Sequence, residues 1–437
     1  MPRTLAAAAA LLLAAAPTLA DTVAFTHAHL ITVTGEEIPD GTLVVKDGRI
    51  AAVGPADRTR IPGGATVVDA AGKVIMPGLV DTHSHVGGFR AADESGPIQP
   101  GVRILDAVNV FSSGYRRAVA GGLTTVNVMP GSGYLSSGQT IYLKLRGVKS
   151  GAVRPEDWAY LDKEGRVLGG LKMANGTNSM RKPPFPGTRG KSAFLVREQF
   201  IAAREYQAKL EAAAGDPAKR PPRDLDLEIL VEVLRGERVV HHHTHRADDV
   251  MTVLRLRQEF GFKVVLHHVS EGWKVAEAIA EAGVPCSIIT VDSPGGKHEA
   301  VNLRFETGAV LAAAGVLVAY HTDDWITDSR LFLRSAAMGL RGGLDRTTAL
   351  ASLTVNGARM LDLDHRIGSL EEGKDADFVI LDGDPLSVYT RVLETWVEGR
   401  KVFDRDDPDD LLHAEGGQGA GRDQEPFLCC ADQGGES

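Results

Sequence analysis

Short apolar runs separated by turns occupy both ends of the chain after residue 22. Between residues 23 and 68 these runs have strand length, and Asp47-Gly48 is typical of a tight β-hairpin turn. The same pattern returns between residues 367 and 403, where apolar runs flank a turn at Glu398-Gly399. We predict that residues 21–77 and 361–403 combine into one small domain, a β-sandwich formed by both chain ends.

Between these ends, apolar runs rich in β-branched residues alternate with stretches of helical period. The strand-like runs lie at residues 79–82, 124–129, 167–173, 238–243, 263–268, 285–291 and 316–320, with a weaker candidate at 140–145. Helix-like stretches at residues 248–260, 272–282 and 299–314 separate the later runs. Alternating strands and helices form a parallel sheet, and eight such units close into a cylinder. We therefore predict an α/β fold whose main domain, residues 78–360, is a (β/α)8 TIM barrel.

Residues 175–225 interrupt this alternation with a Pro-rich loop and a charged helix over residues 191–213. Long βα loops of a barrel lie over its C-terminal face, where they can cover an active site. Two interpretations of the insertion remain open, a substrate lid and a surface excursion.

The two extremes of the chain differ in composition from a folded domain. Arg3, an apolar run at residues 5–16 and small residues at 18–20 are typical of a cleaved secretory signal over residues 1–20. A cleaved signal predicts a periplasmic or secreted protein. The alternative is that residues 1–20 are a membrane anchor. No later run reaches 18 uninterrupted apolar residues, so we predict no membrane span. Residues 404–437 contain ten acidic and two basic residues, which predicts a disordered acidic tail.

Composition narrows the classes of function. The formal net charge is −9, whereas nucleic-acid binding needs clustered Lys and Arg, so we predict no nucleic-acid partner. Three cysteines without a Cys-x-x-Cys pair exclude a disulfide framework. A chain of 437 residues that is 43% hydrophobic can bury its own core, and a homo-oligomer remains open.

Imidazoles gather where the predicted strands end. His83-Ser84-His85 follows the first strand of the barrel, and residues two apart in an extended chain face the same side. Further His and Asp residues follow the fifth, sixth and eighth strands: His241, His242, His243, His245, His267, His268, His321 and Asp323. Because a barrel brings these strand ends together, we predict a site for a divalent, zinc-like cation. The alternative for the strand-five histidines is a non-catalytic metal-scavenging tract of an envelope protein.

Lys172 lies in the fourth predicted strand among small and apolar residues. A buried lysine is costly unless its charge is paired, lost by a pKa shift or removed by modification. Two interpretations remain open. Carboxylation by CO2 would make Lys172 an anionic bridge between two cations, whereas an unmodified Lys172 would form a salt bridge with a barrel carboxylate.

The chain resembles the amidohydrolase superfamily, in particular its imidazolonepropionase-like branch, which includes metal-dependent dipeptidases. The resemblance is carried by residues 76–85 (MPGLVDTHSH), 122–126 (GLTTV) and 368–377 (GSLEEGKDAD). Residues 172–176 and 243–249 resemble a secreted subgroup of that branch. Relatives of this kind imply an acidic residue after Gly176, where this chain has Thr177, so the number of metal ions is left open.

The resemblance implies that His83 and His85 bind one metal ion, and that carboxylated Lys172 bridges to a second ion held by His243 and His268. It also implies that Asp323 binds metal and carries the proton during catalysis. We predict that Asp323 and His268 are the catalytic residues.

Three further residues near the strand-five and strand-eight ends have no assured counterpart in that family. We predict that His245 and His321 contact the substrate. Arg246 is a candidate to bind a substrate carboxylate, and the alternative is that it charges the start of the following helix.

These roles predict a metal-dependent hydrolase that cleaves an amide-like C–N bond in a small molecule, namely a peptide, an N-acyl amino acid or a cyclic amide. A cation lowers the pKa of its bound water from 15.7 toward about 7 and so supplies hydroxide at neutral pH. Asp323 would accept the proton and return it to the leaving amine. One or two divalent ions are expected, with zinc favoured. The alternative function is a mononuclear deaminase or cyclic-imine hydrolase.

Overall fold

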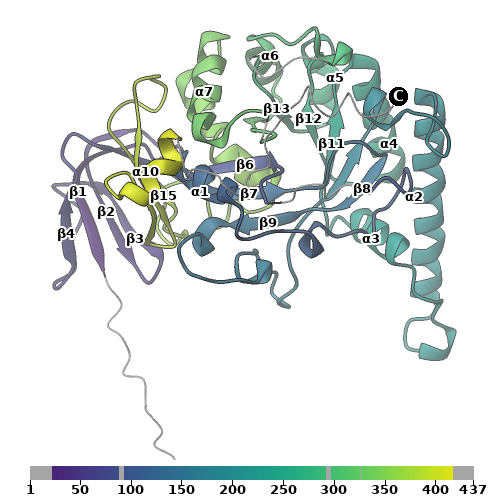
Figure 1. The fold of residues 1–437 in the computed structure, drawn as a ribbon, viewed down its shortest axis with the longest axis horizontal. Coiled ribbons are helices and arrows are strands. Elements are labelled where there is room, and N and C mark those ends of the chain that lie inside the picture. Colours follow the sequence, from purple (N-terminus) through teal and green to yellow (C-terminus); the bar gives the residue numbers. More distant parts are fainter. Residues whose placement is uncertain (1–21, 88–92, 292–296, 325, 417–437) are drawn as a thin grey trace, which may run out of the picture.

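The computed structural model describes residues 22–87, 93–291, 297–324 and 326–416 (Figure 1). The predicted signal over residues 1–20 and residues 417–437 of the predicted tail lie outside these ranges. Within them, no helix combines the length and the apolar character that crossing a membrane requires.

Both ends of the chain contribute to one hydrogen-bonded sheet, which lies at one end of the molecule (Figure 1). Its strand order is β17-β16-β15-β5-β1-β2-β3, and β4 pairs with β1. The strands are β1 (Val23–Leu30), β2 (Ile38–Lys46), β3 (Arg49–Pro55), β4 (Thr66–Asp69), β5 (Val74–Pro77), β15 (Phe378–Leu381), β16 (Val392–Val397) and β17 (Arg400–Asp404). The antiparallel pairing of β5 with β15 joins the two chain ends, as predicted. Phe25, Phe378 and Trp396 pack together in its core, with ring centroids 5.2 to 5.6 Å apart.

Seven parallel strands form the central part of the molecule, in two hydrogen-bonded sheets. They are β6 (Leu79–Ser84), β7 (Leu123–Val128), β10 (Leu171–Ala174), β11 (Val240–Thr244), β12 (Val264–His268), β13 (Cys286–Ile288) and β14 (Val318–Tyr320). Backbone hydrogen bonds connect the sheets on both sides. Asp323 N donates to His83 O over 2.8 Å, and Thr140 N donates to Gly170 O over 2.9 Å.

The weak strand candidate at residues 140–145 does not form a parallel βα unit. The chain instead makes two short strands in succession, β8 (Ser136–Gln139), antiparallel to β10, and β9 (Ile141–Lys144), antiparallel to β7. The physical reason is the short connection after β7, residues 129–135, because a parallel crossover needs a dozen or more residues. The prediction of eight equivalent parallel units is therefore wrong at this position.

Helices flank the parallel strands and follow them in sequence (Figure 1). They are α1 (Ser113–Ala120), α2 (Arg189–Ala212), α3 (Leu225–Leu234), α4 (Ala247–Phe260), α5 (Ala276–Glu281), α6 (Thr307–Ala313), α7 (Phe332–Arg341), α8 (Arg346–Ala351), α9 (Val355–Met360) and α10 (Pro408–Glu415). The predicted helix at residues 248–260 is confirmed as α4.

The helix of the predicted insertion is confirmed as α2, whose first turn is capped by the Thr188 hydroxyl, which accepts from Lys191 N. The helix lies at the edge of the molecule opposite the terminal sheet and packs against α3 and α4 (Figure 1). Phe200 of α2 stacks on Phe260 and Phe262, with ring centroids 5.0 and 5.1 Å away. This position favours the surface excursion over the lid for the helical part of the insertion.

The prediction of disorder from residue 404 onward is wrong for residues 404–416. The structure places α10 there, with the Asp407 side chain accepting from Asp409 N at its start. Asp410 is buried, and its carboxylate binds Arg116 over 3.3 Å and also the Lys149 ammonium. The acidic residues of this segment have basic partners elsewhere in the chain, which composition alone does not reveal.

A buried ion cluster fixes the central strands to the terminal sheet. Lys144, at the end of β9, is fully buried, and its Nζ lies 2.5 Å from Asp375 Oδ2 and 2.9 Å from Asp377 Oδ2. Glu398 adds a third carboxylate at 3.3 Å. The two aspartates belong to residues 368–377, so this stretch has a structural role in joining the two parts of the molecule.

Candidate metal centre

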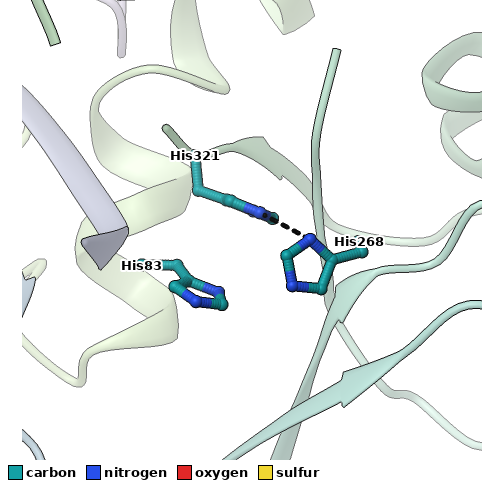
Figure 2. A group of neighbouring side chains, drawn as sticks. All are labelled: His83, His268 and His321. Atoms are coloured by element: carbon teal, nitrogen blue, oxygen red, sulfur yellow. Dashed lines mark hydrogen bonds between the residues drawn. The ribbon is translucent and has the colours of Figure 1, made fainter. Parts of the chain in front are cut away.

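The structure brings together the side chains predicted at four strand ends. His83 ends β6, His243 lies in β11, His268 ends β12 and Asp323 follows β14. The ligand atoms of His83, His85 and Asp323 all lie within 4.8 Å of one another, and so do those of His243, His245 and His268. His83 and His268, one from each group, form a third possible ligand group with His321 (Figure 2). The groups therefore adjoin one another at the carboxyl ends of the strands.

The first group consists of His83, His85 and Asp323. Asp323 Oδ1 lies 3.2 Å from His83 Nε2 and 3.0 Å from His85 Nε2. His85 Nδ1 donates to the Met129 carbonyl over 2.9 Å, so its Nε2 is the nitrogen that faces Asp323 and would face a cation. Burial raises the pKa of the Asp323 carboxyl, but the contacts with His85 and the other imidazoles of the site outweigh burial and hold that pKa below its ordinary range.

The second group consists of His243, His245 and His268. Their ring centroids are 4.3 to 5.0 Å apart. Both ring nitrogens of His243 and the Nε2 atoms of His245 and His268 are buried and have no hydrogen-bond partner among the described residues. Burial lowers the pKa of His243 and His268 well below the ordinary value, and that of His245 to about 3. These neutral imidazoles with unpaired nitrogens fit a cation, because a ligating histidine must be unprotonated.

The backbone is strained at two of these residues. His268 has a φ of 70° and Asp323 a φ of 49°, both in the left-handed region that side chains other than glycine rarely adopt. Such strain occurs at functional sites, where the surrounding structure holds a side chain in a required direction.

Lys172 lies beside the first group. Its side chain is fully buried, and its Nζ lies 3.1 Å from both His83 Nε2 and Met129 Sδ. Among the described residues no carboxylate lies within ion-pair distance of it, which disfavours the salt-bridge interpretation. Burial lowers the pKa of Lys172 to about 7. A substantial fraction is therefore the neutral amine at neutral pH, the form that can react with CO2.

A chain of hydrogen bonds extends from His83 into the interior. His83 Nδ1 lies 3.3 Å from His267 Nδ1, and His267 Nε2 lies 3.0 Å from His241 Nδ1. His241 Nε2 in turn lies 3.0 Å from the Tyr142 hydroxyl. If His83 presents an unprotonated Nε2 to a cation, its Nδ1 carries the proton, and each ring then donates outward until the Tyr142 oxygen accepts. The sequence placed His241 and His267 in the cluster of strand-end histidines but gave neither a separate role, and it gave no signal for Tyr142.

Replacing His267 with Leu is expected to weaken cation binding at the first group by about 10–100-fold, because His83 loses the partner that fixes its orientation and tautomer. His267→Asn, which keeps a hydrogen-bonding group near the Nδ1 position, should lose less. Titration of chelator-stripped protein with Zn²⁺ measures both. Binding by His267→Leu as tight as in the wild type would contradict the role of the chain.

The predicted substrate contact through His321 stays a prediction, and the structure gives the ring other partners. His321 is fully buried, its Nε2 lies 3.2 Å from His268 Nδ1 (Figure 2), and its Nδ1 lies 2.9 Å from Ser287 Oγ. Its ring also stacks on that of His83, with centroids 4.9 Å apart. Both ring nitrogens are thus engaged within the protein, and His321 orients His268.

Arg246 forms an ion pair at the start of α4, as in the alternative in which it has a structural role at this helix. Its Nε and Nη2 donate to the two carboxylate oxygens of Asp248 over 2.9 and 3.0 Å at the start of α4. A contact with substrate remains a prediction.

Glu299, which is far from Thr177 in the sequence, places its carboxylate beside Thr177, the position at which the family resemblance implies an acidic residue. Thr177 N donates to Glu299 Oε1 over 3.0 Å. Arg189, the first residue of α2, binds Glu299 and also Asp249, whose oxygens both lie 2.9 Å from its Nε. This buried cluster holds the start of the insertion helix beside the end of β10.

Comparisons with known proteins identify a family and several relatives for this chain. A model of the amidohydrolase family matches residues 113–403. A solved amidohydrolase from Thermotoga maritima is 31% identical, with a TM-score of 0.79, over 88% of this chain and 100% of that one. An imidazolonepropionase from Solibacter usitatus is 28% identical over 78% of this chain and 84% of its own length. Amidohydrolase tasK from Hapsidospora irregularis is also 28% identical, over 83% of this chain, which spans 40% of tasK.

The chain therefore belongs to the amidohydrolase family. It has the mixed α/β fold of TIM-barrel type found in its structural relatives, and it is a hydrolytic enzyme that acts on C–N bonds.

Proposed function

We propose that this enzyme cleaves an amide-like C–N bond in a small substrate, such as a peptide, an N-acyl amino acid or a cyclic amide, with Asp323 as the proton carrier. The observation that carries the proposal is the position of the Asp323 carboxylate, within 3.2 Å of His83 and His85 and 4.0 Å from His268 Nε2. A general base in such a place can reach a water molecule and a scissile bond held between the two groups of ligands.

The residues of the site have different roles in the proposed hydrolysis. One or two divalent cations, zinc in this proposal, would be held by His83, His85, His243, His268 and Asp323, with Lys172 as a further ligand if it is carboxylated. Such a cation would lower the pKa of water toward about 7 and polarise the scissile carbonyl. Asp323 accepts the proton of the attacking water and then donates it to the leaving nitrogen, so it acts first as base and then as acid. The contacts of Asp323 with the imidazoles of the site favour the carboxylate form that the first step needs.

Removal of the metal is expected to lower the hydrolytic rate by about 10³-fold, since a cation supplies several kcal/mol of transition-state stabilisation. The test combines elemental analysis of the purified enzyme with a screen of dipeptides and N-acyl amino acids before and after dialysis against a chelator. Addition of Zn²⁺ should restore the activity. Full activity of protein shown to be free of metal would exclude this function.

A second candidate is a mononuclear deaminase or cyclic-imine hydrolase. A 5-methylthioadenosine/S-adenosylhomocysteine deaminase from Symbiobacterium thermophilum is 24% identical over 84% of this chain, and several imidazolonepropionases match as well. A metal-to-protein ratio of one, an unmodified Lys172 and release of ammonia from a cyclic substrate would favour this function. A non-catalytic envelope metal-binding protein is disfavoured by the family.

We further propose that the two central sheets close into one barrel and that the terminal sheet folds over as a sandwich. We also propose that the protein is exported to the periplasm or secreted. The composition of residues 1–20 supports export, and the hydrogen bonds between the sheets support closure. Mass spectrometry of the protein exported by a bacterial host would show cleavage after Ala20.

A further inference from the structure

We propose that His245 is a third metal ligand, so that His243, His245 and His268 form a cation site of three imidazoles that does not depend on Lys172. This inference rests on the proposed metal-dependent function. It differs from the ligand set implied by family resemblance, in which His243 and His268 share their metal with a carboxylated Lys172.

The first support is the direction of each ring. His245 Nδ1 is bonded to Ser270 Oγ over 2.7 Å, and His268 Nδ1 to His321 Nε2 over 3.2 Å. Each of these rings therefore uses one nitrogen outward and has its Nε2 left for a ligand. This is the arrangement of ligating histidines, which bind metal with one nitrogen and a neighbouring polar group with the other.

The second support is the environment of the free nitrogens. The Nε2 atoms of His245 and His268 and both nitrogens of His243 are buried and unpartnered among the described residues. One nitrogen from each of the three rings lies within 4.8 Å of those from the other two. Three buried acceptors without donors are costly, and one cation would satisfy all three.

The chemistry of the donor set indicates which cations fit. Three neutral imidazoles with an open fourth position match a catalytic zinc site, and imidazole donors select Zn²⁺, Co²⁺, Ni²⁺ or Cu²⁺ over Mg²⁺ and Ca²⁺. The two oxygens of Asp323 divide between the groups, since Oδ1 faces His83 and His85 whereas Oδ2 lies 4.0 Å from His268 Nε2. Asp323 can thus link two cation sites without a carbamate.

The test is a titration of the chelator-stripped full-length protein with Co²⁺, followed by absorption spectroscopy and elemental analysis. The wild type should bind two ions. His245→Ala should weaken one of the two sites by about 100-fold and leave the other unchanged, and Ser270→Ala should weaken the same site by about 10–100-fold. Lys172→Met should keep both ions. His365→Ala, a change of the same kind at an exposed histidine, is the control.

The outcomes separate this inference from the proposed function. Two ions bound at wild-type affinity by His245→Ala, together with a raised KM, would make His245 a substrate contact and overturn the inference. Loss of one ion in Lys172→Met would also overturn it, as would a single wild-type ion that His245→Ala does not affect. In each of these cases a metal-dependent hydrolase remains. Failure of the wild type to bind any ion would remove both proposals. Near-UV circular dichroism of the stripped variants checks that they are folded.

Discussion

Asp323→Asn is expected to lower kcat by about 10²–10⁴-fold while the protein keeps nearly all of its bound metal. Asn preserves the size of the side chain and one oxygen that can face His83 and His85. It cannot accept a proton, so the step in which water attacks loses its base. The measurement is kcat on the best substrate of the amide screen, with metal content determined on the same samples.

The control for this variant is Asp324→Asn, the same change at the next residue. Asp324 is also buried, but its carboxylate accepts hydrogen bonds from the backbone and side chain of Ser329, away from the imidazoles. Asp324→Asn should keep kcat within a few-fold of the wild type. Full activity of Asp323→Asn, or an equal loss in both variants, would refute the assignment of Asp323 as the proton carrier.

The convergence of the site was predictable because two simple rules sufficed. Residues two apart on a strand share a face, and the carboxyl ends of parallel strands meet at one end of a sheet. These rules bring His83 and His85 together with Asp323 and with the histidines of β11 and β12. The rules need only the approximate position at which each strand ends, so an error of one or two residues in a strand boundary leaves the predicted site unchanged.

The division of labour among the histidines was not predictable from those rules. Alternation places His241 and His243 on the same face of β11. His241 lies two residues farther from the carboxyl end of the strand, however, where its Nε2 is bonded to the Tyr142 hydroxyl and does not reach the possible metal ligands. His321 follows its strand as His83 does, yet its ring turns toward His268. Depth along the strand and side-chain direction depend on packing with distant segments, which periodicity does not contain.

The same limit explains the two errors in the fold. The antiparallel β8 and β9 follow from a connection too short for a crossover, a constraint visible in the spacing of strands but overridden by the expectation of eight equal units. The helix α10 is stabilised by Arg116 and Lys149, which lie 294 and 261 residues before Asp410 in the chain. Acidic composition predicts disorder only where such partners are absent.

Lys144→Met is expected to lower the free energy of unfolding by about 3–5 kcal/mol, because it leaves the buried Asp377 without the ammonium that pairs with it. Asp375 also loses this ammonium but keeps Arg366, whose Nη2 lies 2.9 Å from its Oδ2. Both aspartates are almost completely buried, so water cannot replace the lost ammonium. Urea unfolding of the full-length protein, followed by circular dichroism, measures the change. Lys263→Met is the matched control: Lys263 pairs with Asp362 over 2.9 Å with both side chains more than half exposed, and its loss should cost at most about 1 kcal/mol.

Charge, and not the loss of side-chain volume, should account for the effect of Lys144→Met. Adding Asp375→Asn and Asp377→Asn to the variant removes the buried negative charges that faced the ammonium and should therefore restore part of the lost stability. A loss equal to that of Lys263→Met, or no recovery in the triple variant, would show that the cluster does not hold the terminal sheet to the central strands. Lys144 is the last residue of β9, the antiparallel strand that follows β8. The expected result would therefore give this antiparallel segment a structural role, which is to place the Lys144 ammonium beside Asp375 and Asp377.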